Sequence, residues 1–233
     1  MNVDVLLNIV EQVFRVFPFE VFLKSIAQVW YLVPIFIVVK IFKSNWFKGV
    51  MGEYLVNRSL SKLPHSHYTL LKDVTLPTKD GSTQIDHVVV STFGIFVVET
   101  KNMQGWIFGS ENQRQWNQTI FRHKVKFQNP LRQNYKHIKT LEHLLGCNKE
   151  IFHSVVVFVG NCKFKTDMPQ NVTKVHGCIR YIKQFQEEVL TANECHEIIE
   201  TINNIKFSRG VTTNRMHRKN VQTLVASKEA LKK

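Results

Sequence analysis

Three charged side chains, Asp86, Glu99 and Lys101, stand in a stretch of the chain that is otherwise mostly apolar. The stretch is QIDHVVVSTFGIFVVETK, in which two apolar runs flank the short segment Ser91–Gly94. A short glycine-containing segment between two such runs predicts a β-hairpin. Because side chains alternate between the two faces of a strand, Glu99 and Lys101 share one face of the second strand.

The length of the turn sets which residues of the hairpin face each other. If Val90 pairs with Ile95, Asp86 falls opposite Glu99. Directly opposed side chains have Cβ atoms roughly 4.5–5.5 Å apart, where two like charges are destabilising. A divalent cation between the carboxylates would remove this conflict, with Lys101 beside the water that such an ion carries. The alternative is an ordinary hairpin whose charged ends reach solvent, with Lys101 simply neutralising Glu99.

The composition favours a polyanionic partner. The 233 residues include 31 Lys and Arg against 18 Asp and Glu, which gives a formal net charge of +13. Such a surplus favours nucleic acid or anionic lipid head groups, the alternative being a surplus that serves only solubility. The four cysteines are far apart and include no CxxC pair, which argues against a zinc ribbon and fits a reducing compartment. We expect them to act as small apolar residues.

The N-terminal part is apolar enough to meet a membrane. Residues 1–23 have apolar residues at helical intervals, as in a helix lying at an interface. Residues 25–39 contain no charge, and the longer segment 19–42 reaches the roughly 20 residues that a span requires. Lys40 and Lys48 follow, so the positive-inside rule predicts a single-pass protein with its C-terminal domain in the cytoplasm. A buried soluble helix is the alternative.

The chain is expected to form three parts. These are a helical membrane anchor over residues 1–47, a folded domain over residues 48–207 and a basic flexible tail over residues 208–233. Within the folded domain, strands are predicted over 68–76, 105–110, 115–120, 153–159 and 172–175, and helices over 179–189 and 191–205. His123–Lys126 is a small basic stretch between predicted elements.

Two further helices bear on the hairpin. One is predicted from Lys48 to Leu63 with Glu53 on its apolar face, either as a third acidic group directed at the hairpin or as a first-turn glutamate favoured by the helix dipole. The other begins with Asn129 as N-cap and Pro130 at the first helical position, and ends before Gly146. In that second helix Gln133 and His137 are expected on a solvated face.

Taken in order, these motifs resemble the nuclease-related (NERD) domain, which is similar to the PD-(D/E)xK nuclease superfamily. The segments that carry the resemblance are GEYLVNRSLSKL, LLKDVTLP, GSTQIDHVVVSTFGIFVVETKNMQGWIFGS and NPLRQNYKHI, within about residues 49–160. The resemblance implies an α/β fold with a restriction-endonuclease-like mixed sheet flanked by helices. Members often carry an N-terminal membrane segment, which fits residues 19–42. Ile85 stands where the motif name has proline, a residue frequently lost in the superfamily.

The resemblance also implies a set of site residues. Asp86 matches the metal-binding aspartate, Glu99 and Lys101 match the ExK pair, Glu53 matches the acidic residue of the first helix, and Gln133 matches the glutamine of the helix after the sheet.

These matches imply a membrane-anchored nuclease that hydrolyses phosphodiester bonds of DNA or RNA. Magnesium, with manganese as a substitute, would be held by Asp86, Glu99, the Thr100 carbonyl and Glu53, directly or through water. One alternative is a non-catalytic, membrane-tethered protein that binds nucleic acid or acts as a scaffold. Another is a peripheral lipid-binding protein, which only the two ends of the chain favour.

Overall fold

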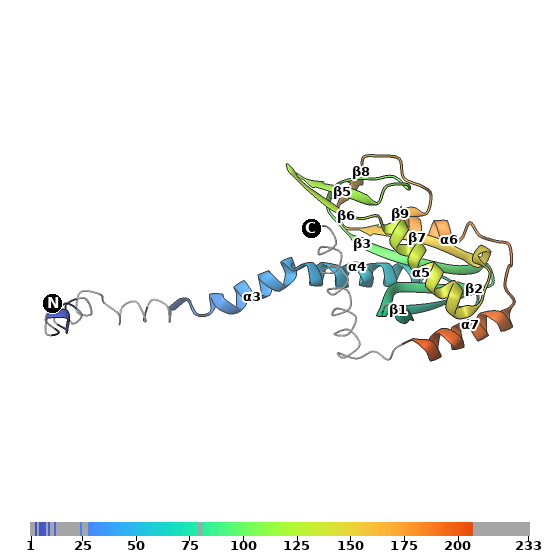
Figure 1. Ribbon diagram of the computed structural model, residues 1–233, viewed down its shortest axis with the longest axis horizontal. Coiled ribbons are helices and arrows are strands. Elements are labelled where there is room, and N and C mark those ends of the chain that lie inside the picture. Colours follow the sequence, from blue (N-terminus) through green and yellow to red (C-terminus); the bar gives the residue numbers. More distant parts are fainter. Residues whose placement is uncertain are drawn as a thin grey trace. The chain divides into compact units, whose positions relative to one another are not determined.

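The computed structural model describes residues 28–78 and 81–206, together with a few isolated positions before residue 28. The chain separates into two compact units, Met1–Lys48 and Gly49–Lys233. Every described strand belongs to the second unit (Figure 1). The predicted tail, residues 208–233, lies outside the described residues.

The main sheet of the second unit has five strands in the order β1-β2-β3-β7-β9. The strands β1, β2 and β3 are antiparallel neighbours, β7 runs parallel to β3, and β9 runs parallel to β7. The predicted mixed sheet is therefore confirmed. The strand bounds are β1 (Tyr68–Thr78), β2 (Gly81–Ser91), β3 (Gly94–Asn102), β7 (Phe152–Val159) and β9 (Val172–Lys174).

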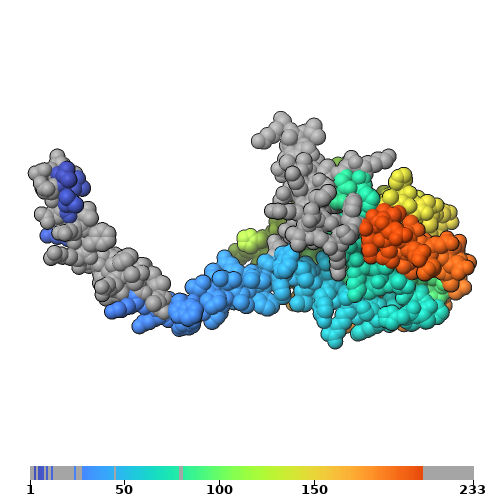
Figure 2. Space-filling view, turned by 90° about the horizontal axis from the view of Figure 1, so that it is seen from below, coloured from blue at the N-terminus to red at the C-terminus, as the bar shows by residue number. Residues whose placement is uncertain are grey.

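Helices cover both faces of this sheet, which explains why β2 has a continuous apolar run. Val88 and Val90 point to the face covered by α5 and α7, whereas Val89 points to the face covered by α4 and α6. Figure 2 shows α7, in orange-red, beside the blue-green surface of the first strands. All four cysteines are unpaired and three are buried, as predicted. The helices are α4 (Asn45–Leu60), α5 (Pro130–Leu145), α6 (Val175–Ile182) and α7 (Ala192–Ile205).

A second sheet of four strands, in the order β6-β5-β4-β8, continues from the first. Backbone hydrogen bonds from Met103 N to Val159 O and from Gly105 N to Asn161 O join the ends of β3 and β7 to β4 and β8. One face of this sheet packs on the main domain through Trp116 and its neighbours. The strands are β4 (Gly105–Phe108), β5 (Gln115–Ile120), β6 (His123–Gln128) and β8 (Cys162–Phe164).

Strand β6 was not predicted, and its exposure explains why. Val125 and Phe127 alternate with polar residues, but only Phe127 is even partly buried, so the strand has no buried apolar face. It lies at the edge of the second sheet, where exposed lysines are common because they discourage pairing with another chain. The same lysines made the segment resemble a basic loop.

Two helices differ from their predicted extents. The helix α4 begins at Asn45 instead of Lys48, because the Ser44 hydroxyl caps it by accepting a hydrogen bond from Phe47 N at 3.1 Å.

The helix α6 covers Val175–Ile182 instead of 179–189. The chain turns after α6, and the backbone N–H groups of Val189 and Leu190 donate to the carbonyl of Thr92. Apolar spacing alone could not reveal this contact with the hairpin turn, which replaces further helical bonds.

In the first unit, the helix α3 (Leu32–Lys43) has no buried residue. The predicted span of residues 19–42 reaches this helix, but residues 19–23 and 25–27 lie outside the described residues. Within the described part of the chain, no helix combines the length and the apolar character that crossing a membrane requires. Membrane attachment through residues 19–42 stays a prediction.

The start of α7 has a capping box that can be tested. The Thr191 hydroxyl accepts a hydrogen bond from Glu194 N, and the Glu194 carboxylate accepts one from Thr191 N at 2.7 Å. We expect Thr191→Ala to lower the free energy of unfolding by about 1 kcal/mol in a urea titration. Thr140→Ala is the control, because the Thr140 hydroxyl bonds only to the Lys136 carbonyl of its own helix. An equal loss in both variants would contradict the expectation.

Candidate functional site

The hairpin has the predicted register. Val90 pairs with Ile95, and the regular pairing ends at His87 and Val98, one position before Asp86 and Glu99. At that point Asp86 Oδ2 accepts a hydrogen bond from Thr100 N at 2.7 Å. The Asp86 carboxylate is thus tied to the backbone of β3 between Glu99 and Lys101.

Glu99, Lys101 and Gln133 form a connected group beside Asp86. The Lys101 ammonium donates to Glu99 Oε1 at 2.7 Å and to Gln133 Oε1 at 2.9 Å. The Glu99 side chain is only 3% exposed, whereas that of Lys101 is 21% exposed. The group therefore combines a buried carboxylate with an ammonium that reaches solvent. Gln133 comes from the first turn of α5. The helix begins at this point because the Asn129 side chain caps it by accepting a hydrogen bond from Leu131 N.

The second oxygen of Glu99 faces His137, which the sequence had placed on a solvated face. This expectation was wrong, because His137 is buried and its Nε2 lies 3.3 Å from Glu99 Oε2. The two atoms are near enough for an ion pair, but they lack the alignment of a hydrogen bond. The other ring nitrogen, Nδ1, lies 2.9 Å from the Thr83 hydroxyl. The buried stripe of α5 includes polar residues, so its apolar residues alone predicted the wrong face.

Glu53 approaches the same end of the sheet from α4. Gly52 lets the helix come close, because a Cβ there would lie 2.9 Å from the Cβ of Asn102 at the end of β3. Glu53 is half-buried, and its charge acts on Asp86. The structure thus brings all five predicted side chains, Glu53, Asp86, Glu99, Lys101 and Gln133, to one end of the hairpin.

The two carboxylates hold protons differently. Burial and the nearby Glu99 charge raise the pKa of Asp86 well above its ordinary value, against the hydrogen bond from Thr100 N. Burial would also raise the pKa of Glu99, but His137 and Lys101 outweigh it and lower that pKa. Asp86 therefore takes up a proton more readily than Glu99, as expected for two like charges in one site.

We expect Asp86→Asn to stabilise the protein in chelator. A raised pKa in the folded state means that stability is fully present below the ordinary pKa near 4 and is lost as pH rises through the raised value. Asparagine keeps the acceptor for Thr100 N and removes the charge. The gain should be about 1 kcal/mol at neutral pH and should vanish below about pH 4.

Thermal unfolding at several pH values measures this gain. Glu142→Gln is the control, because the Glu142 carboxylate is paired with Lys139 in a more exposed position. A lower melting temperature of Asp86→Asn at neutral pH would contradict the expectation.

The site offers carboxylate oxygens and little else as metal ligands. Across residues 28–78 and 81–206, no group of three or more His, Cys, Asp or Glu side chains is arranged to hold a metal ion. Asp86 and Glu99 remain as two neighbouring carboxylates, and Glu99 Oε2 is a buried oxygen without a hydrogen bond in this structure. Two carboxylates with water match what magnesium usually takes from a protein.

Comparison with known proteins gives the family. The model of the nuclease-related domain matches residues 48–159, which include the hairpin and α5. An uncharacterized protein of Bacillus anthracis is 40% identical over 188 residues, covering 78% of this chain and 88% of that protein. No solved structure matches the chain. With its hairpin, its α5 helix and the residues between them all inside the matched region, this chain belongs to the nuclease-related domain family.

Proposed function

We propose that this protein is a metal-dependent nuclease that hydrolyses phosphodiester bonds of nucleic acid. The observation that carries the proposal is the group of Glu99, Lys101 and Gln133, joined by hydrogen bonds of 2.7 and 2.9 Å, with Asp86 held beside it by Thr100 N at 2.7 Å. Membership of the nuclease-related family supports it, and the net charge of +13 suits a polyanionic substrate.

The residues present fit a magnesium ion, with manganese as a substitute. Asp86 and Glu99 would hold it with the Thr100 carbonyl, and Glu53 would act through water. When bound, such an ion activates water for attack and polarises the phosphoryl oxygen. Burial, and after it the charge of Glu99, raise the pKa of Asp86, so a cation between the two carboxylates would offset a repulsion that the site contains.

Lys101 would contact the reacting groups, and Gln133 would position Lys101. An ammonium has three N–H donors, and Lys101 directs two of them to Glu99 and Gln133. Among the described residues no third acceptor is assigned to it, so one donor is available to the attacking water or to a phosphate oxygen. There it would offset the negative charge that builds up on the phosphate. Gln133 would hold the ammonium in that direction.

A nuclease assay on the full chain tests the proposal. Single- and double-stranded DNA and RNA should each be incubated with magnesium, manganese or chelator. We expect cleavage with either metal and none with chelator. If nucleic acid is bound but not cut with any substrate or metal, a non-catalytic binding protein replaces the nuclease.

A further inference from the structure

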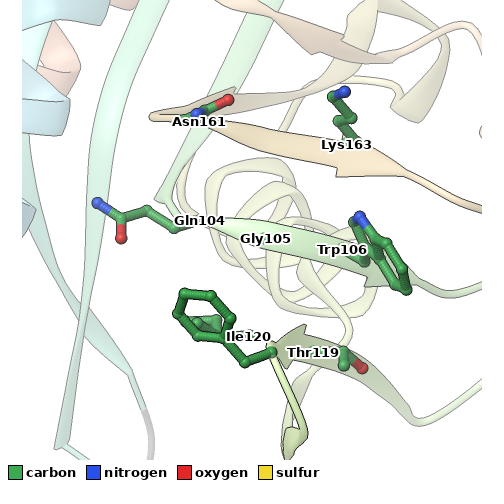
Figure 3. A pocket seen from close by; sticks show the side chains of 8 residues that line it. Gln104, Gly105, Trp106, Thr119, Ile120, Asn161 and Lys163 are labelled. Carbon is green, nitrogen blue, oxygen red and sulfur yellow. The ribbon is translucent and has the colours of Figure 1, made fainter.

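A cleft of about 630 Å³ opens where β3 runs into β4, outside the candidate site (Figure 3). Figure 3 shows Gln104 and Trp106 along the middle of its lining, with Asn161 and Lys163 on one side and Thr119 on the other. The cleft therefore joins the end of the main sheet to the exposed face of the second sheet.

The register of the second sheet puts a row of side chains on that exposed face. Lys163, Trp106, Thr119 and Lys124 are direct neighbours on the four adjacent strands, and all of them except the buried Thr119 are exposed. Trp106 is 49% exposed, although most tryptophan side chains are largely buried. The Lys165 ammonium lies 4.7 Å from the centre of its ring. An exposed indole between lysines is the combination that stacks on a base and holds the adjacent phosphates.

The charge of this sheet has one sign. The strands β4, β5, β6 and β8 contain no Asp or Glu, and their lysines Lys124, Lys126 and Lys163 are all exposed. On the opposite face Ile107 and Trp116 are buried against the main domain, although Val125 and Ile120 at its outer end are exposed. Around Trp106 the charged face is therefore the more accessible of the two. The face thus favours an anionic ligand that also has flat apolar groups.

A second aromatic ring stands at the rim of the cleft. Phe121, in the turn between β5 and β6, is 96% exposed and has a φ of +53°. A backbone in this region costs a non-glycine residue free energy, and the exposed ring gains no burial in return. Such a residue suits a surface whose partner is another molecule.

The cleft lies close to the candidate site along the chain. Trp106 follows Lys101 by five residues, so their Cα atoms are at most about 18 Å apart. A strand of nucleic acid that leaves the site can reach the indole. This closeness favours nucleic acid over lipid as the ligand.

We propose that the cleft binds a single-stranded part of the nucleic-acid substrate, with a base stacked on Trp106 and phosphates held by Lys163 and Lys124. The inference deepens the proposed nuclease function and rests on it. A single strand is required because the bases of a duplex are stacked on each other and do not offer their faces to a side chain. Phe121 would hold a second base at the rim.

Binding of labelled oligo(dT) to the full chain in chelator tests the inference, because binding is then measured without cleavage. We expect Trp106→Ala to weaken binding at least about tenfold, which is 1.4 kcal/mol and within the range for one stacked base. Trp106→Phe keeps a ring and should retain most of the affinity. Lys163→Ala should weaken binding and reduce its dependence on salt, whereas Lys183→Ala, an exposed lysine outside the second sheet, should not.

The outcomes separate this inference from the proposed function. Unchanged oligo(dT) binding by a folded Trp106→Ala variant overturns the inference, even if the wild-type protein cuts nucleic acid. Binding of the wild type that depends on Trp106, without cleavage in any metal, supports the cleft and overturns the nuclease. Binding to vesicles of phosphatidylserine and phosphatidylcholine is measured for the same variants. If Trp106→Ala weakens only vesicle binding, the face is a lipid surface and the inference is wrong.

Discussion

Replacement of Lys101 by alanine is expected to lower the rate of phosphodiester cleavage by about 10²–10³-fold, the usual cost of losing one donor to a developing charge. The variant loses the ammonium that links Glu99 to Gln133 and reaches solvent beside them. Binding of nucleic acid in chelator should change little, because the other surface lysines and arginines hold the backbone without reference to the site. Initial rates in magnesium and binding titrations in chelator measure the two effects separately.

The chain offers a matched control for this experiment. Lys139 donates to Glu142 at 2.7 Å, the same distance as in the Lys101–Glu99 pair, but on the exposed side of α5. Lys139→Ala should therefore leave cleavage unchanged. Cleavage by Lys101→Ala at the wild-type rate would remove Lys101 from the proposed chemistry.

A second variant separates two roles of Lys101. Lys101→Arg keeps the positive charge in a side chain that does not give up its proton in proteins. Partial rescue of cleavage by arginine would favour a role in holding charge. A loss as large as that of alanine would favour a proton transfer or a strict requirement for the shape of lysine.

The parts of the fold that depend on local chemistry could be predicted from the sequence. The hairpin register followed from the glycine-containing turn, because Gly94 has a φ of +123° and a Cβ there would lie 2.7 Å from the His153 ring. The start of α5 could be predicted because Asn129 caps the helix and Pro130 suits its first position. With that register, alternation along β3 was enough to put Glu99 and Lys101 on one face.

The features that could not be predicted depend on contacts between segments that are distant in the sequence. His137 is buried because Glu99 and Thr83, on two different strands, lie against its ring. The sequence of α5 does not reveal this burial, because a histidine on a solvated face would have the same spacing from the apolar residues. The cleft was likewise not predicted, because its row of side chains requires β6 to pair with β5, and the short alternation of Val125 and Phe127 with lysines was not recognised as a strand.

Substitutions of two adjacent residues of α5 are expected to have different effects: loss of Gln133 should lower cleavage, and loss of Asn134 should lower stability. Asn134 is fully buried, and its Nδ2 lies 2.7 Å from Val97 O, 2.9 Å from Ser154 Oγ and 3.3 Å from Val155 O. This one amide therefore ties the helix to both β3 and β7. Gln133, half-buried, contacts Lys101 instead. Successive residues of a helix point about 100° apart, so one meets the sheet and the other the site.

Asn134→Ala should lower the free energy of unfolding by about 3 kcal/mol, because buried acceptors lose their donor and a cavity remains. The melting temperature should fall by about 6–12 °C for a folded unit of this size. Gln133→Ala should change stability by less than about 0.5 kcal/mol and lower cleavage about tenfold or more, as for a residue that positions another.

Thermal unfolding and cleavage, measured below both melting temperatures, separate the two variants. There, Asn134→Ala should cut at nearly the wild-type rate, since its contacts stabilise the sheet and do not touch Lys101. Equal destabilisation by both variants would mean that Gln133 belongs to the packing of α5 rather than to the site. A large loss of cleavage in folded Asn134→Ala would mean instead that the position of α5 against β3 and β7 sets the geometry of Lys101, so that stability and activity depend on the same contacts.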